Sequence, residues 1–303
     1  MNISPLLLVA AFPLSMLGQD LFSPKALPIP SSKAELADLL LSDFPRPKTA
    51  NLEYIDWIPG PRAEAPTFAV YQVRWQAIGP VFGVGLLLLP HEAPLLNVIA
   101  LPDPSQLPED LCGLPPYSLP HCSPFALQLA QAGCRVLVPL TLPPQTSPHL
   151  LSLETQKILA AVDALKQMIP RSTSRKVAAV GWNRGAQLAF LSATLDQRIH
   201  AAAGGGLTAA QRSHLKAFPQ ANASFLWDAP EPGEFAMGGA LLKALFLACD
   251  LSQEEIPEVE DVYLKAIASL PNHDIIEERI GTQKTELKLF QAWRVLEEDH
   301  PLE

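Results

Sequence analysis

The stretch that decides the fold is Val177-Ala178-Ala179-Val180-Gly181-Trp182-Asn183-Arg184-Gly185. Its first four residues are an apolar run typical of a buried strand, and residues 186–195 follow a helical pattern. Glycines stand two residues before and two residues after Asn183, where the absence of a Cβ lets a strand and a helix approach closely. The pattern predicts a tight strand-to-helix turn with Asn183 at its tip.

The segments around this turn alternate between strand and helix patterns. Strands are predicted at 68–75, 82–89, 95–101, 135–140, 176–181, 198–204 and 223–228, and helices at 33–41, 124–132, 153–168 and 184–195. Such alternation indicates βαβ units, so we predict an α/β fold with a mostly parallel sheet and helices on both faces. The first two strands have no helix between them, which predicts an antiparallel edge. On the helix at 153–168, Lys157 and Lys166 are expected to face water.

Length and composition indicate one folded domain preceded by a leader. The 303 residues are 48% hydrophobic and 17% charged, which is typical of a globular protein with a substantial core. Residues 67–303 are expected to form the domain, with a helical C-terminal end over 235–251, 254–270 and 274–298. The Pro-rich residues 19–66 are expected to pack on the domain as a leader. The net charge of −9 argues against nucleic acid as a partner, because phosphate binding needs a basic face.

An apolar stretch at residues 6–17 precedes the leader. It is too short to cross a bilayer, which takes ~20 residues, so no transmembrane segment is expected. It fits the apolar region of a secretory signal spanning residues 1–18, which predicts export to the periplasm or the extracellular space. The stretch has no Lys or Arg before it and no clean small-x-small cleavage site. An apolar N-terminal segment packed on the domain is therefore the alternative.

The four cysteines allow two interpretations. Cys112 and Cys122 bracket a Pro-rich loop and could close it as a disulfide in an exported protein. Alternatively, all four are reduced thiols, with Cys134 and Cys249 simply buried. No pair has the close spacing of a zinc site, and neither a metal nor a cofactor is expected.

Several segments between Val98 and Gly206 carry a family resemblance. The turn at 181–185 has the layout of the G-x-S-x-G nucleophile elbow, with Asn in place of Ser. The other matching segments are 98–103 (VIALPD), 125–139 (FALQLAQAGCRVLVP), 156–163 (QKILAAVD) and 196–202 (DQRIHAA). Over roughly a third of the chain, their order and spacing resemble α/β-hydrolases of the acetyl xylan esterase and dienelactone hydrolase type. The alternative is a plain strand-to-helix turn in which Asn183 caps the helix.

The resemblance implies a position for each part of a hydrolase site. Asn183 would stand at the nucleophile position, and the Arg184 N–H would be the first oxyanion donor. The loop Asp103–Ser105 would supply the second donor. Asp228, at the end of a predicted strand, is the candidate acid, and His273 is the candidate base. Both also have plain structural interpretations, Asp228 as a residue that ends a strand and His273 as a loop or cap residue.

Several residues depart from a working hydrolase. The Asn183 carboxamide has no removable proton and cannot act as an acyl-transfer nucleophile. Pro104 lacks an N–H and removes one donor from the oxyanion loop. Ser192 lies about two and a half turns along the helix, too far to replace the missing Ser. His200 falls in a predicted strand and is expected to pack, and His300 is expected in a solvated tail.

These departures favour a hydrolase-like protein whose ester-cleaving activity is lost or severely reduced. Such a protein could keep a pocket for an ester, a carbohydrate or a protein partner. Two alternatives are open at this point. One is an active ester hydrolase with an unusual constellation, and the other is a non-catalytic binding or scaffold domain of an exported assembly.

Overall fold

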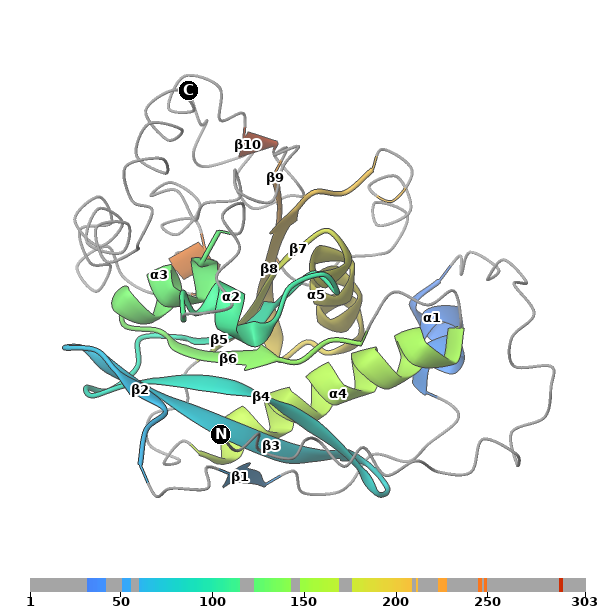
Figure 1. Cartoon of the computed structure of the whole chain (residues 1–303). Coiled ribbons are helices and arrows are strands. Elements are labelled where there is room, and N and C mark those ends of the chain that lie inside the picture. Colours follow the sequence, from blue (N-terminus) through green and yellow to red (C-terminus); the bar gives the residue numbers. More distant parts are fainter. Residues whose placement is uncertain are drawn as a thin grey trace.

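The structure, a computed structural model, describes residues 32–41, 51–55, 60–114, 123–142, 148–168, 176–208, 211, 223–227, 245–246, 248–249 and 289–290. Within these residues ten strands form one sheet, with helices on both of its faces (Figure 1). The predicted class, an α/β fold with a mostly parallel sheet, is confirmed.

The centre of the sheet is parallel. It consists of β5 (Asn97–Leu101), β6 (Arg135–Pro139), β7 (Val177–Trp182), β8 (Ile199–Gly205) and β9 (Ala223–Trp227). Their order across the sheet is β6-β5-β7-β8-β9. Every residue of β5, β6 and β7 is buried, which explains why their sequences are continuous apolar runs rather than alternating ones.

Antiparallel strands flank this centre. β3 (Phe68–Ile78) and β4 (Val81–Pro90) form a hairpin, and β4 pairs antiparallel with β6, as the sequence predicts. Two short strands, β1 (Leu52–Tyr54) and β2 (Ala63–Glu64), pair with β3. At the other edge β10 (Leu289–Phe290) pairs antiparallel with β9. The helix predicted over 274–298 is therefore wrong at these two residues, whose backbone pairs with the edge of β9.

The helices divide between the two faces. α1 (Lys33–Leu41), α4 (Pro148–Gln167) and α5 (Arg184–Leu195) pack on one face and share its apolar core. α2 (Pro108–Leu111) and α3 (Phe125–Gln131) pack on the other face. Among the described residues, no helix combines the length and the apolar character needed to cross a bilayer.

α1 belongs to the N-terminal part of the chain but is built into the core. Its Leu36 and Leu40 are buried against the face that carries α4 and α5. The Leu40 carbonyl, at the end of α1, accepts hydrogen bonds from Ser152 Oγ at 2.7 Å and from Gln156 Nε2 at 3.0 Å. These bonds satisfy a carbonyl that the helix end leaves without an intrahelical partner, and they fasten α1 to α4.

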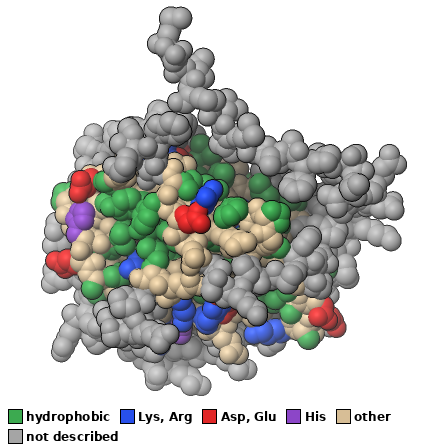
Figure 2. Space-filling view, turned by 90° about the horizontal axis from the view of Figure 1, so that it is seen from below, with side chains coloured by type: hydrophobic (Ala, Val, Ile, Leu, Met, Phe, Trp, Pro, Cys, Tyr) green, Lys and Arg blue, Asp and Glu red, His purple; other side chains and the backbone are tan. Residues whose placement is uncertain are grey.

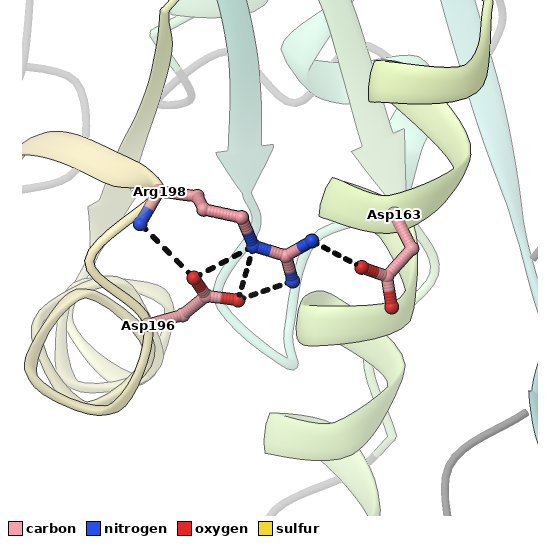
Figure 3. Close-up of polar contacts among 3 residues, drawn as sticks. All are labelled: Asp163, Asp196 and Arg198. Atoms are coloured by element: carbon pink, nitrogen blue, oxygen red, sulfur yellow. Dashed lines mark hydrogen bonds and ion pairs between the residues drawn. The ribbon is translucent and has the colours of Figure 1, made fainter. Parts of the chain in front are cut away.

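A cluster of charges fastens the start of β8 to α4 (Figure 3). Arg198 Nε donates to both carboxylate oxygens of Asp196, at 2.9 and 3.1 Å, and Arg198 Nη1 donates to Asp163 on α4 at 2.5 Å. The hydrogen bond to Asp196 is the main cause that raises the pKa of Arg198. The arginine is thus held between two elements of the scaffold, as expected of a structural ion pair.

Basic side chains do not form a continuous face on the side of the molecule seen in Figure 2. They lie in separate groups, with acidic side chains and a broad apolar area between them. This distribution agrees with the net charge of −9. This face does not offer the dense positive surface that a phosphate backbone needs.

Candidate functional site

The strand order places a switch in chain direction at the centre of the sheet. The chain passes from β5 to β6 on one side, and then crosses back to β7 on the other side of β5. In open α/β sheets, ligands bind at such a point, outside the carboxyl ends of the strands. Three segments leave the sheet there, namely residues 102–107 after β5, 140–142 after β6 and 183–187 after β7. We call these three segments the mouth.

Asn183 stands at the tip of a strained turn in the mouth. Its backbone has φ +47° and ψ −110°, and it is the one non-glycine residue with positive φ in the described part of the chain. The turn is held from both sides, because the Asn183 N–H donates to the Gly205 carbonyl at 2.8 Å and the Asn183 carbonyl accepts from the Gln187 N–H at 3.1 Å. The side chain is exposed. A residue held in such a sparsely populated conformation points to a site built for a function.

The glycines around this turn allow the close approach that the sequence predicts. A Cβ on Gly181 would lie 2.3 Å from the carbonyl carbon of Gly185, and one on Gly185 would lie 2.1 Å from the Leu101 carbonyl oxygen. Both distances are far inside van der Waals contact, so only glycine fits. A strained turn of this kind, after the buried strand at the switch point and before α5, has the layout of the nucleophile elbow. The chain has the α/β-hydrolase fold.

Comparisons with known proteins return solved structures of esterases. An acetyl xylan esterase from Paenibacillus sp. R4 is 16% identical, with 86% of this chain and 81% of that chain covered and a TM-score of 0.42. Acetyl xylan esterase 1 from Thermoanaerobacterium sp. is 12% identical, with 58% of each chain covered and a TM-score of 0.38. A glucuronoyl esterase from Solibacter usitatus is 13% identical, with 58% of this chain and 57% of that chain covered and a TM-score of 0.41.

The chain spans only part of many of these proteins. It covers 50% of a Bacteroides fragilis structure provisionally described as an acetyl xylan esterase, to which it is 14% identical with a TM-score of 0.43. No protein-family model matches the sequence. No curated protein matches it either. The assignment of the hydrolase fold therefore rests on the strand order and on the elbow.

The loop after β5, where a hydrolase places its second oxyanion donor, is closed on itself. The Asp103 N–H donates to Gln106 Oε1 at 2.9 Å, and the Ser105 N–H donates to Asp103 Oδ1 at 3.0 Å. The Gln106 N–H donates to the Asp103 carbonyl at 2.8 Å. Pro102 and Pro104 have no N–H. Each N–H from residue 102 to residue 106 is thus absent or already has an acceptor within the loop.

The predicted first oxyanion donor, the Arg184 N–H, lies at the start of α5. Arg184 is the first residue of α5, and its N–H is one of those that a helix start leaves without an intrahelical partner. In the hydrolase fold, the N–H after the nucleophile position is aimed at the developing oxyanion. The role of the Arg184 N–H as the first donor stays a prediction, and the N–H groups of the loop that should supply the second donor already have acceptors within that loop.

A buried ion pair lies behind the mouth. Glu154 and Lys157 on α4 have side chains that are only 8% and 7% exposed, and Lys157 Nζ lies 2.8 Å from Glu154 Oε1. Lys157 Nζ also donates to the Leu140 carbonyl at 2.9 Å and so fastens the loop after β6. The prediction that Lys157 faces water is wrong. Helical periodicity alone does not predict that Glu154, three residues earlier and on the same side of the helix, neutralises a buried lysine.

Arg184 adds a further charge next to Asn183. Its side chain is half-buried, and its Nη1 donates to Gln187 Oε1 at 2.8 Å. Burial lowers the pKa of the Arg184 guanidinium, and the negative charge of Glu154 partly opposes this shift. The guanidinium thus loses hydration without gaining a carboxylate contact among the described residues.

Two exposed leucines stand in the mouth. Leu107, at the end of the loop after β5, is 40% exposed, and Leu142, after β6, is 36% exposed. Leu142 follows Thr141, which is buried. Both leucines belong to loops that follow the carboxyl ends of neighbouring strands, β5 and β6.

The remaining predicted site residues are not brought together in the described part of the chain. Asp228, His273 and His300 lie outside the described residues, so their roles stay predictions. His200 lies at the amino end of β8, the sheet edge opposite Asn183. Burial, followed by the positive charge of Lys176, lowers the pKa of His200.

The serine and cysteine predictions have mixed outcomes. Ser192 is fully buried within α5, in agreement with the expectation that it cannot reach the mouth. Cys112, Cys134 and Cys249 are buried in the core on the α3 face. Cys122 lies outside the described residues, so the disulfide between Cys112 and Cys122 stays a prediction.

Proposed function

We propose that this protein uses the mouth of a hydrolase fold to bind a ligand and has lost, or nearly lost, the ability to cleave esters. The observation that carries the proposal is the Asn183 side chain, which is exposed at the tip of a strained elbow. The position is built to present a nucleophile, and a carboxamide is not one. The strained geometry of the turn is thus present while a reactive atom at its tip is missing.

The loop after β5 supports the same conclusion independently. Stabilising an oxyanion takes donors aimed at the place where the charge develops, and removal of one donor costs about 10²–10³ in rate. Here the N–H groups of Asp103 and Ser105 donate to acceptors within their own loop. A nucleophile alone would therefore not restore the site, because the loop would still have to open.

The ligand that we propose is an ester or a carbohydrate, the class that the sequence resemblance implies. Binding needs neither the missing nucleophile nor the second donor, so the losses at Asn183 and in the loop leave it intact. Export of the protein, with residues 1–18 as a signal, is part of the proposal and is tested by N-terminal sequencing of the mature protein. A mature chain that still begins at Met1 would contradict export by that signal.

The experiment that tests the loss of activity is hydrolysis of p-nitrophenyl acetate by the purified protein. We expect no burst of p-nitrophenol and no turnover above that of the matched Asn183→Ala variant. The variant Asn183→Ser is expected to stay inactive, because the loop still lacks a donor. The double variant Asn183→Ser/Pro104→Gly, which also restores an N–H to the loop, is the better candidate for a revived hydrolase. Wild-type turnover that disappears in Asn183→Ala would sink the proposal.

A further inference from the structure

Among the described residues, the charged side chains of Arg184, Lys157 and Glu154 leave one positive charge without a carboxylate contact. Arg184 and Lys157 contribute two positive charges, and Glu154 contributes one negative charge. Glu154 already pairs with Lys157, whose ammonium lies 2.8 Å away, and both side chains are buried. The carboxylate is therefore the counterion of Lys157, and in the part of the chain that the structure describes Arg184 makes no ion pair of its own.

Arg184 also keeps hydrogen-bonding capacity. A guanidinium has five N–H donors arranged as a planar fork. In the described part of the chain, its side chain has one hydrogen-bond acceptor, Gln187 Oε1. That oxygen belongs to a neutral amide on the next turn of α5, which orients the guanidinium without cancelling its charge. The residue is half-buried and directly follows the exposed Asn183 of the mouth.

We propose that the ligand of the mouth carries a carboxylate, which binds the Arg184 guanidinium, and an apolar body, which contacts Leu107 and Leu142. A carboxylate matches the fork of an arginine with two parallel N–H···O bonds, and such charge-assisted bonds are about twice as strong as neutral ones. The inference rests on the proposed function, because it takes the mouth as a ligand site. It narrows the ligand from esters and carbohydrates in general to compounds with a free acid group.

The net charge of the protein does not favour anions, so a preference for carboxylates has to come from residues at the mouth. With a net charge of −9, the protein as a whole repels anions. Asp103 lies on the neighbouring loop, and its Oδ1 accepts hydrogen bonds from the Ser105 N–H and from Ser105 Oγ at 2.6 Å. Preferential binding of a carboxylate over a neutral molecule of the same shape would therefore have to come from a specific cation, for which Arg184 is the candidate.

The experiment compares benzoate with benzamide, which has the same shape and no charge, by thermal shift and by titration calorimetry. We expect wild-type protein to bind benzoate at least about tenfold more tightly than benzamide in low salt, a difference of about 1.4 kcal/mol. The preference should shrink as NaCl is raised, since salt screens the ion pair. Backbone amide NMR signals of residues 183–187 should shift with benzoate.

Three variants locate the effect. Arg184→Gln is expected to reduce the benzoate preference to about one, and Arg184→Lys to keep part of it, because lysine retains the charge but not the fork. Arg74→Gln is the matched control, since Arg74 lies on β3, is 46% exposed and pairs with Glu53 at 2.7 Å. It should bind like wild type.

The proposal is overturned if wild-type protein binds benzoate and benzamide equally, if it binds neither, or if Arg184→Gln keeps the preference. Should Arg184→Gln not fold, the wild-type comparison, its salt dependence and the NMR shifts still decide. The outcome is separate from that of the proposed function. A protein that hydrolyses p-nitrophenyl acetate and also prefers benzoate contradicts the loss of activity but not the carboxylate site.

Discussion

Replacing Lys157 by methionine should destabilise the protein strongly, because it leaves a buried carboxylate without its partner. Glu154 is 8% exposed, and the Lys157 ammonium at 2.8 Å is its counterion. Removing one partner of a buried pair typically costs about 3–5 kcal/mol of unfolding free energy. The Leu140 carbonyl would lose its 2.9 Å donor as well, at a cost of about 1 kcal/mol. The charge of Arg184 acts on Glu154 and offsets part of this loss, so we expect about 3 kcal/mol in total.

Removing both charges should cost much less than removing one. In the double variant Lys157→Met/Glu154→Leu, neither member of the pair is left charged without the other, and apolar side chains of similar volume replace the pair. Such replacements are often neutral or stabilising. We expect the unfolding free energy of the double variant to lie within about 1–2 kcal/mol of the wild-type value and well above that of Lys157→Met. A double variant that is more stable than Lys157→Met would show that the loss in Lys157→Met comes from the unpaired charge and not from loss of packing.

The assay is urea unfolding followed by far-ultraviolet circular dichroism, with the unfolding free energy taken by linear extrapolation. The surface pair Arg74–Glu53, with side chains 46% and 49% exposed, provides the control. Arg74→Met should cost less than about 1 kcal/mol, because exposed pairs contribute little. The reasoning is refuted if Lys157→Met costs less than about 1 kcal/mol, or if the double variant is less stable than Lys157→Met.

Three further predictions concern the elbow and the core. Gly185→Ala should lower the free energy of unfolding, measured in urea, by more than about 3 kcal/mol, because its Cβ would lie 2.1 Å from the Leu101 carbonyl oxygen. Gly79→Ala is the control and should lower it by only about 1 kcal/mol, because a Cβ there meets open space. Equal losses in the two variants would contradict the packing argument. Asn183→Gly should raise the unfolding free energy by up to about 1 kcal/mol, since glycine adopts φ +47° without strain, and a destabilised variant would show that the turn is not strained. Burial raises the pKa of Cys249 to about 12. As pH rises above about 8.5, the ordinary pKa of a thiol, Cys249 ionises in the unfolded chain while it stays protonated in the folded protein. The free energy of unfolding should therefore fall by about 1.4 kcal/mol per pH unit between about pH 8.5 and pH 12. Cys249→Ala should flatten the fall in Tm over this range, and an unchanged slope would refute the assignment.

The sequence predicts the scaffold well because its central elements carry strong local patterns. β5, β6 and β7 are buried on both faces, so their apolar runs are unbroken and flanked by turn residues. The turn at 181–185 can also be predicted from the sequence, since Gly181 and Gly185 are needed for contact distances that no other residue allows. The short strands β1, β2 and β10 were missed, because two or three residues carry no periodicity and depend on pairing with a neighbour.

The candidate site is harder to predict from the sequence than the scaffold, because its chemistry depends on contacts between distant segments. Pro104 signals one lost donor, but nothing in the sequence shows that the N–H groups of Asp103 and Ser105 turn inward. The burial of Lys157 likewise follows from its contact with the Leu140 carbonyl, 17 residues away. Periodicity assigns a lysine to water unless its partners are known; Glu154 lies on the same helix, but the Leu140 carbonyl lies in another segment.

The backbone at position 183 is held in a conformation that few residues other than glycine adopt, with φ +47° and ψ −110°. The hydrogen bonds of Asn183 to Gly205 and Gln187, and the close approach of Gly185 to Leu101, hold the turn in this conformation. Its side chain makes no hydrogen bond to the start of α5, so capping the helix does not account for its presence. Helix capping alone would favour an ordinary extended conformation at this position. The strained geometry, an exposed carboxamide and a neighbouring arginine that makes no ion pair among the described residues favour the proposed binding site over a residue that only stabilises the turn.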